Sequence, residues 1–138
     1  MTWTTFNVEP TGAVMVGDDT LLVGAVFMCA ELICVGSRCV ISYNVTIADC
    51  DFHPVDVEAR RRDAIATSPT GNRSDRPPLM TAPVHIGDGV RIGTGAIILK
   101  GVHIGDHATV APGAVVAYSI PANSHAIGNP AVATEQSP

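Results

Sequence analysis

One histidine in this sequence has the neighbours that acid–base chemistry needs. His53 lies in the segment DCDFHP, two residues after Asp51 and four after Asp49. Imidazole is the side chain best suited to take up a proton near neutral pH, and either aspartate could fix its tautomer and raise its basicity. Pro54 restricts the residue before it to extended geometry, which helps to aim the ring. Taken alone, however, these residues are more typical of a histidine in a surface turn.

Most of the basic residues lie just downstream of His53. Five of the eight lysines and arginines fall within residues 53–85, namely Arg60, Arg61, Arg62, Arg73 and Arg76. The same stretch has several prolines and no repeat, and a long excursion of this kind in a compact repeat protein is either a functional arm or disordered. Residues 55–66 could form a short helix, and 67–78 are expected to be extended or in turns.

The residues after this stretch repeat with a period of six. From Ile86 the chain reads IGDGVR, IGTGAI, ILKGVH, IGDHAT, VAPGAV and VAYSIP, with a β-branched aliphatic residue first and an apolar residue fifth in every block. A period of six fits neither a helix nor an alternating strand. It predicts a coil in which each block makes one short strand and one corner, and three blocks close a triangular turn. A β-sandwich of short strands would give irregular spacing.

A looser form of the repeat precedes residue 53. Its leading positions are Val16, Leu22 and Met28 and, after a one-residue offset, Val35, Ile41 and Ile47. Both halves together hold twelve blocks, or four triangular turns, two before residue 53 and two after residue 85. We therefore expect one domain over residues 1–138, with an irregular lead-in at 1–13 that caps the first coil, an extruded loop at 53–85 and a C-terminal tail at 122–138.

Composition excludes several functions. The formal net charge of −5 opposes non-specific binding to nucleic acid or an anionic membrane, because both need a basic face. The sequence has no signal-peptide pattern and no apolar stretch long enough to span a bilayer, so a cytoplasmic protein is expected. The four cysteines show no CxxC pairing, which favours buried thiols over disulfides or a zinc site. They are Cys29, Cys34, Cys39 and Cys50.

These features together resemble a known family. The hexapeptide run resembles the left-handed parallel β-helix acyltransferases. The segments ISYNVTIADCDFHPVDVEAR, PVHIGDGVRIG and IGNPA are similar to the maltose, galactoside and polysaccharide O-acetyltransferase branch, over roughly residues 30–131. The resemblance implies an all-β fold, a left-handed parallel β-helix of about four triangular coils with one long extruded loop. It also implies a homotrimer whose active sites lie in the clefts between neighbouring subunits, each loop reaching across to the adjacent one.

The resemblance also implies roles for individual residues. His53 falls on the family's catalytic histidine, the general base on an acceptor hydroxyl that attacks the thioester of acetyl-CoA. A backbone N–H near Gly93 or Thr94 is the expected donor to the oxyanion. We expect the acceptor to be a sugar or glycan, and no metal is expected. The candidates for orienting the acceptor are Asn44, Glu31, Asp49 and Asp51.

The chain departs from this branch where the nucleotide end of CoA would bind. Arg91 replaces a tryptophan that usually lines the cleft. Ala117 and Tyr118 replace a common Thr-Lys pair, and the basic residues expected after GNPA are absent. The CoA phosphates must then be held by Arg91, by Lys100 or by the arginine-rich loop. Thr94 and the corners that contain Gly93 and Pro112 still match the family's pantetheine-binding edge.

Two other functions are compatible with a coil of this kind. A γ-type carbonic anhydrase needs three histidines around zinc between subunits, and the candidates here are His85, His103 and His107. Their spacing differs from that of the anhydrases. A non-catalytic scaffold that only trimerises is the other alternative, and the retained aspartate–histidine segment before Pro54 is the main argument against it.

Overall fold

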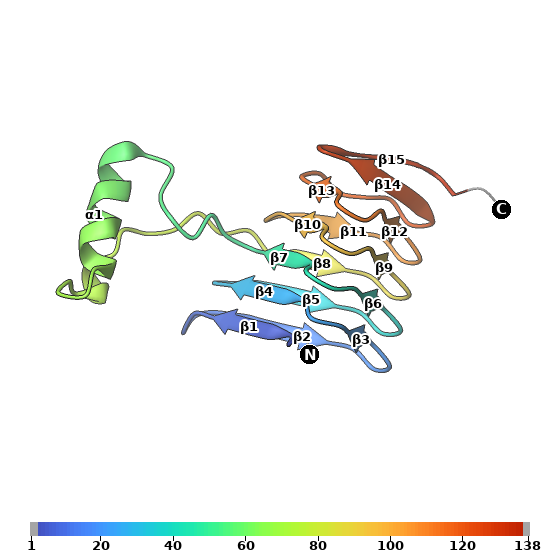
Figure 1. The fold of residues 1–138 in the computed structure, drawn as a ribbon, viewed down its shortest axis with the longest axis horizontal. Helices are drawn as coiled ribbons and strands as arrows, with labels where there is room; N and C mark the ends of the chain where they lie inside the picture. The colour runs from blue at the N-terminus through green and yellow to red at the C-terminus, as the bar shows by residue number, and fades with distance from the viewer. Residues whose placement is uncertain (1–2, 137–138) are drawn as a thin grey trace.

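Three parallel sheets form the sides of a triangular prism in the computed structural model, which describes residues 3–136 (Figure 1). Sheet A contains β1 (Thr5–Val8), β4 (Val26–Cys29), β7 (Thr46–Ala48), β10 (Ile97–Ile98) and β13 (Val115–Val116). Sheet B contains β2 (Ala13–Val16), β5 (Leu32–Val35), β8 (Val84–Ile86) and β11 (His103–Ile104). Sheet C contains β3 (Leu21–Leu22), β6 (Val40–Ile41), β9 (Arg91–Ile92), β12 (Thr109–Val110), β14 (Ser124–Gly128) and β15 (Ala131–Glu135).

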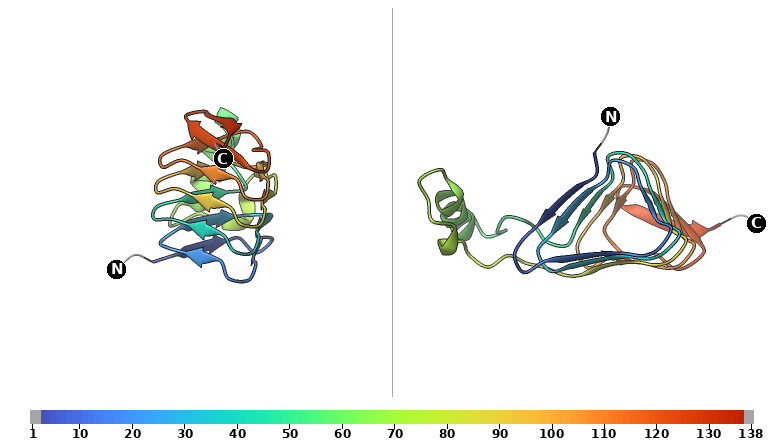
Figure 2. Two further views of the ribbon diagram at one scale, coloured as in Figure 1. Left: turned by 90° about the vertical axis from the view of Figure 1, so that its right-hand side faces the viewer. Right: turned by 90° about the horizontal axis from the view of Figure 1, so that it is seen from below.

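The coil is a left-handed parallel β-helix. Seen along its axis from the N-terminal end, the chain passes from β1 to β2 to β3 anticlockwise while it recedes from the viewer (Figure 2). Successive strands of each sheet pair in parallel, and β15 alone among the described strands runs antiparallel, folding back on β14. The predicted fold class is confirmed.

The six-residue pattern sets the core. The leading residues from Ile86 to Val116 and the fifth residues from Val90 to Ile120 all point inward, and none is more than 4% exposed. Aliphatic side chains from stacked strands therefore form one continuous column of apolar contacts. A single turn of the coil could not bury these residues, so the stack as a whole stabilises the fold.

The leading residue of the second coil is Phe27 and not the predicted Met28. Phe27 is fully buried and lies in register with Ile47 of β7, whereas Met28 is only half-buried. The spacing from Leu22 to Phe27 is one residue short of six, and the spacing from Phe27 to Val35 is two residues too long. The one-residue offset in the sequence is the sum of these two irregular corners, so it concealed which residue points inward.

The coil extends beyond both ends of the repeat seen in the sequence. The lead-in expected to be irregular contains β1, which pairs with β4 along its whole length, and β2 begins at Ala13. The tail expected after residue 121 contains β14, which pairs with β12, and β15. Residues 1–2 and 137–138 of those segments lie outside the described residues. These end strands were not predicted from the sequence. Several of their apolar side chains are exposed, so apolar residues do not mark inward-facing positions there at six-residue intervals.

Aspartates in the IGD blocks tie one turn of the coil to the next. At the corner between sheets B and C, Asp88 accepts a hydrogen bond from the Ser37 N–H at 2.8 Å. Asp106 accepts one from the Asp88 N–H, also at 2.8 Å. The carboxylate of each later coil therefore satisfies a corner N–H that the sheets leave unpaired.

A long arm leaves the prism after β7 and returns at β8, at the corner between sheets A and B (Figures 1 and 2). The helix expected at 55–66 is found as α1 (Val57–Thr67), and Asp56 caps it by accepting from the Ala59 N–H at 2.8 Å. A short 3₁₀ helix, η1 (Arg73–Asp75), lies in the stretch expected to be extended or in turns. None of the helices in the described residues is long and apolar enough to cross a membrane.

All four cysteines are free thiols. Cys29, Cys39 and Cys50 are buried, and Cys34 is half-buried on β5. Burial, assisted by the neighbouring Asp49 carboxylate, raises the pKa of Cys29 to about 11. That thiol therefore behaves as a small apolar side chain of the core.

Candidate active site

The chain turns sharply just before His53. Phe52 has a φ of 59°, in the left-handed region that bulky residues rarely adopt, and the His53 N–H donates to the Asp51 carbonyl at 2.7 Å across it. Such a conformation persists only where its surroundings hold it. Here the Arg76 guanidinium donates to the Phe52 carbonyl at 2.9 Å, and the Phe52 N–H donates to the Cys50 Sγ at 3.3 Å.

The carboxylate that orients His53 comes from the arm. His53 Nδ1 lies 2.7 Å from Asp63 Oδ2, on α1. The histidine side chain is 66% exposed and that of Asp63 only 1% exposed. An ionised carboxylate can only accept, so Nδ1 carries the proton and the lone pair of Nε2 is left for a substrate. The prediction that Asp49 or Asp51 orients the ring is wrong.

Arg76 holds Asp63 in turn. Its Nε donates to Asp63 Oδ1 at 2.6 Å and its Nη2 donates to Oδ2 at 3.3 Å. The hydrogen bonds from Arg76, and then that from His53, hold the pKa of Asp63 below its ordinary value, although burial acts in the opposite direction. The buried carboxylate therefore stays ionised, and the imidazole has a fixed orientation.

Asp49 and Asp51 have structural roles instead. Asp49 is fully buried and accepts from three consecutive backbone N–H groups at 2.7 Å each, those of Ala30, Glu31 and Leu32. It thus closes the long corner between β4 and β5. Asp51 accepts from Lys100 Nζ at 2.6 Å, so the ammonium group proposed for the CoA phosphates already has a carboxylate partner.

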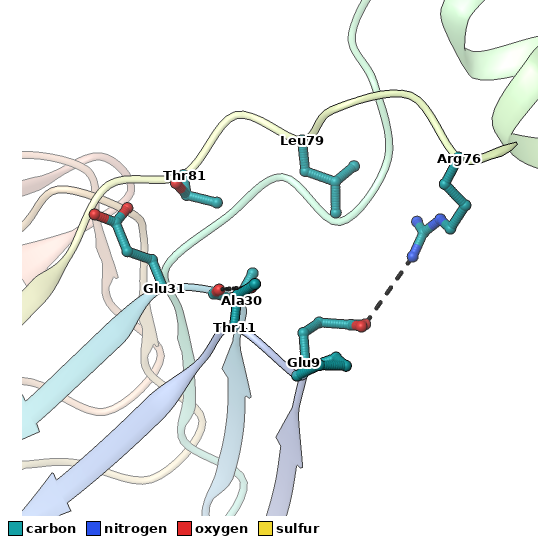
Figure 3. Close-up of a pocket in the computed structure, with 8 residues that line it drawn as sticks. Glu9, Thr11, Ala30, Glu31, Arg76, Leu79 and Thr81 are labelled. Atoms are coloured by element: carbon teal, nitrogen blue, oxygen red, sulfur yellow. Dashed lines mark hydrogen bonds and ion pairs between the residues drawn. The ribbon is translucent and has the colours of Figure 1, made fainter. Parts of the chain in front are cut away.

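A pocket of about 430 Å³ opens beside Arg76, between the returning arm and the corner that joins sheets A and B (Figure 3). Glu31 and Glu9 line it, and Arg76 Nη1 lies 4.0 Å from Glu9 Oε1. The threonines Thr11 and Thr81 add hydroxyl groups to the wall. Of the four acceptor-orienting candidates, Glu31 lines this pocket.

The residues assigned to pantetheine lie at a different corner, between sheets C and A. The Gly113 N–H donates to the Thr94 carbonyl at 2.9 Å, which stacks the Pro112 turn on the Thr94 turn. Asn44, exposed and with a φ of 54°, occupies the same corner one turn earlier. The Gly93 N–H donates to the Val110 carbonyl at 2.8 Å, so it is not free to bind an oxyanion as predicted.

The remaining cofactor candidates are divided between the two corners. Lys100, Ala117 and Tyr118 follow strands of sheet A and so lie on the arm side, where Tyr118 is 70% exposed. Arg91 projects from β9 into a groove of about 260 Å³ that Gly93 and Pro112 also line. Sheet A separates the two corners, so one chain does not bring all the predicted site residues together.

The histidines proposed for a zinc site do not converge. His85 and His103 lie in register on sheet B with ring centroids 6.0 Å apart, while His107 lies at the next corner. Within residues 3–136 no group of three or more histidine, cysteine, aspartate or glutamate side chains is placed to hold a metal ion.

Sequence reasoning missed Asp63 and the part played by Arg76. Asp63 is ten residues from His53, and Arg76 is thirteen residues beyond Asp63, in a segment with no repeat. The one available signal was the helix expected over residues 55–66, which places Asp63 on a regular element. Nothing in the spacing indicated that this helix would turn Asp63 toward His53.

The coil is built from six-residue repeats, and residues 83–117 match the family model described as bacterial transferase hexapeptide (six repeats). Among solved structures, the chain is similar to a maltose O-acetyltransferase from Clostridium difficile 630, with 28% identity, a TM-score of 0.72 and coverage of 97% of this chain and 66% of that one.

A hexapeptide-repeat acetyltransferase from Vibrio cholerae O1 biovar eltor, solved in complex with acetyl-CoA, is 27% identical with a TM-score of 0.72. The alignment covers 93% of this chain and 62% of that one, so the chain spans less than two thirds of either relative's length. A galactoside acetyltransferase in complex with CoA shares the fold at 24% identity, with a TM-score of 0.74 and coverage of 98% and 62%. No curated protein matches the chain.

Proposed function

We propose that this protein is an acetyltransferase that moves the acetyl group of acetyl-CoA to a hydroxyl group of a sugar or glycan, with His53 as general base. The observation that carries the proposal is the His53–Asp63 pair, in which a buried carboxylate holds an exposed imidazole with Nε2 free. The similarity to two acetyltransferases at 27 and 28% identity supports the acetyl-transfer chemistry.

The reaction would need His53 twice. Nε2 takes the proton of the acceptor hydroxyl while the hydroxyl oxygen attacks the thioester carbonyl carbon. The resulting tetrahedral intermediate then loses the CoA sulfur, and the imidazolium returns its proton to that sulfur. A positioned base contributes about two to four orders of magnitude to such a step. Asp63 would stabilise the imidazolium and keep Nδ1 as the donor.

A backbone donor would stabilise the oxyanion of that intermediate. The Gly93 N–H is occupied, whereas the Thr94 N–H has no acceptor within residues 3–136. Thr94 is exposed at the end of its turn, beside Pro112 of the following turn. We therefore assign the oxyanion donor to Thr94 rather than to Gly93.

The acceptor would bind in the pocket beside Arg76. Carboxylate oxygens of Glu9 and Glu31 can accept hydrogen bonds from sugar hydroxyls, and the hydroxyls of Thr11 and Thr81 can donate or accept. Arg76 connects this pocket to Asp63 and so to His53. Asn44, at the opposite corner, would reach an acceptor only from a neighbouring copy.

A second copy would complete each active site. The arm carries His53 at one corner, while Thr94 and Pro112 lie at another. Two apolar side chains of the arm, Val57 and Ile65, are 71% and 55% exposed in the single chain, which favours burial of the arm against a neighbour. We infer a homotrimer in which the arm of one copy meets the Thr94 corner of the next.

The test is His53→Ala, assayed by CoA release with a panel of sugar and glycan acceptors. The variant should lose about two to four orders of magnitude in kcat, because the imidazole that takes up the acceptor proton is removed. Circular dichroism and calorimetric titration with acetyl-CoA should match the parent protein. His85→Ala, which removes an exposed ring on sheet B, is the matched control and should keep full activity.

Equal turnover by His53→Ala and the parent protein would refute the general-base assignment. Failure of the parent protein to bind acetyl-CoA at millimolar concentration would favour the non-catalytic scaffold over the acetyltransferase.

A further inference from the structure

We propose that the groove on the outer face of sheet C is a phosphate-binding site formed by Arg91, Thr109 and His125. Its ligand would be a phosphate group of the acyl donor, and that part of the proposal rests on the proposed function. The three side chains come from β9, β12 and β14, which are adjacent strands of sheet C.

The register of sheet C brings the three side chains together. Thr109 lies opposite Arg91 on one side and opposite His125 on the other. Their neighbours Ile92, Val110 and Ala126 are buried, so the three residues all face outward. They line a groove of about 260 Å³ together with Gly93, Val110, Ala111 and Pro112.

Arg91 is a cation with no partner among the described residues. Within residues 3–136 its exposed guanidinium makes no hydrogen bond and no ion pair. By contrast, Lys100 is held by Asp51, and Arg76 is held by Asp63. A guanidinium presents a planar set of donors that suits phosphate oxygens, and an unpaired one loses no internal contact when it binds an anion.

The groove contains no carboxylate. Its lining is one arginine, one histidine, one threonine and apolar or glycine residues. The pocket beside Arg76 instead has two glutamates in its wall. Glu135 lines an adjoining pocket that shares Thr109 and His125, but it does not line the groove itself. In a chain of net charge −5, a groove lined only by cationic and neutral groups offers a local site for an anion.

A hydrogen-bond network presents His125 as a donor. The Gln136 amide donates to the His107 carbonyl at 3.0 Å, to the Ser124 carbonyl at 2.9 Å and, more weakly, to Thr109 Oγ1 at 3.4 Å. The Thr109 hydroxyl can donate its proton to Nδ1 of His125, at 2.5 Å. Nε2 of the neutral ring then carries the proton and can donate to a phosphate oxygen.

The position of the groove favours the donor as its ligand. Gly93 and Pro112 belong both to the groove and to the corner expected to hold pantetheine. A phosphate bound to Arg91 would thus lie beside the pantetheine part of the same CoA molecule. Residues 131–138, where basic residues are expected for this contact, contain no lysine or arginine. A phosphorylated acceptor has the same anion chemistry, and the experiment below separates the two.

The first measurement is the affinity for inorganic pyrophosphate, obtained by titration that is monitored by ³¹P NMR and by calorimetry. Arg91→Gln should weaken pyrophosphate binding about tenfold, because a charge-assisted bidentate contact is lost. His125→Gln should weaken it by a smaller factor. Arg38→Gln, which removes another exposed arginine from the same sheet's corner, should leave the affinity unchanged. Absence of pyrophosphate binding by the parent protein, or equal affinity in all three variants, would overturn the site.

The second measurement compares two donors. With Arg91→Gln, KM for acetyl-CoA should rise about tenfold at unchanged kcat, whereas kcat/KM for acetyl-pantetheine, which has no nucleotide phosphates, should not change. An unchanged KM for acetyl-CoA in a variant with weakened pyrophosphate binding would overturn the assignment to the donor. If the parent protein transfers no acetyl group but Arg91→Gln still weakens pyrophosphate binding about tenfold, the phosphate site stands and the proposed function fails.

Discussion

At the scale of single residues, His53 depends on two side chains that lie far from it in the sequence. Asp63 fixes its tautomer, and Arg76 fixes Asp63 while also binding the Phe52 carbonyl beside the histidine. Arg76 thus holds both the orienting carboxylate and the strained turn that carries His53. This arrangement explains how a ring that is 66% exposed can keep one orientation.

Asp63→Asn tests the orienting role. An amide in place of the carboxylate can donate to Nδ1, which would put the ring proton on Nε2 and remove the base. We expect kcat to fall about 10²-fold or more, with the affinity for acetyl-CoA unchanged, as measured by steady-state kinetics and calorimetry. A loss of acetyl-CoA affinity with kcat preserved would contradict the orienting role.

The same aspartate predicts a pH dependence of the arm. Its pKa is lower in the folded protein than in the unfolded chain, so the Asp63 contacts contribute their full stability above the ordinary aspartate value of about 3.9. That contribution is lost as the pH falls from there through the folded-state pKa. The protection factors of the α1 amides against hydrogen exchange should therefore fall below about pH 4, and Asp63→Asn should show no such step.

At the scale of elements, the corners decide where the coil can depart from six residues. The corner between β4 and β5 is two residues too long, and its extra N–H groups are satisfied by Asp49 from the next turn. The regular corners between sheets B and C need only one such bond each, from Asp88 or Asp106. The irregular corner therefore depends on a buried carboxylate that the repeat does not contain.

Asp49→Asn should destabilise the protein strongly. The amide nitrogen would face backbone N–H groups that cannot accept, leaving buried donors unpaired, at a cost of about 3 kcal/mol in the free energy of unfolding. Asp106→Asn, which disturbs one bond at an exposed corner, should cost much less. Urea unfolding followed by circular dichroism measures both. Similar losses in the two variants would contradict the role given to Asp49.

At the scale of the whole molecule, the proposed active site is divided between corners of the prism. His53 and the Glu31 pocket lie at the arm, while Thr94, Pro112 and the Arg91 groove lie across sheet A. A neighbouring copy that turns its Thr94 corner toward the arm would unite them. The exposed apolar residues of α1 would then be covered by that neighbour.

Mixed oligomers test this arrangement. His53→Ala removes the base, and Pro112→Arg blocks the Thr94 corner, so each variant alone should be inactive. The two variants are coexpressed with different tags, and mixed trimers are purified by affinity for both tags in turn. Each mixed trimer has one site that combines an intact His53 with an intact Thr94 corner. About one third of the parental activity should therefore return. Sedimentation should show three copies. No recovery in such mixed trimers, or full activity in a monomer, would contradict shared sites.

The sequence by itself determined the coil, because a six-residue apolar period from Ile86 to Val116 is a local pattern that each block repeats independently. It also indicated the start of the arm and its helix, since His53, Pro54 and the break in the repeat are adjacent in the chain. The inward residue of the second coil, Phe27, was missed. One corner beside it is a residue short and the next is two residues too long, so the spacing from Leu22 to Val35 departs from the expected value by only one residue.

Only the tertiary structure decided which side chains meet. Asp63, on α1, contacts His53. Asp49 instead accepts hydrogen bonds from backbone N–H groups of the preceding turn of the coil. Likewise, Arg91, Thr109 and His125 are separated in sequence by many residues and become neighbours through strand register alone. Hydrogen-bond partners of this kind depend on distances in space, and a six-residue period carries information only about which face of a strand each residue occupies.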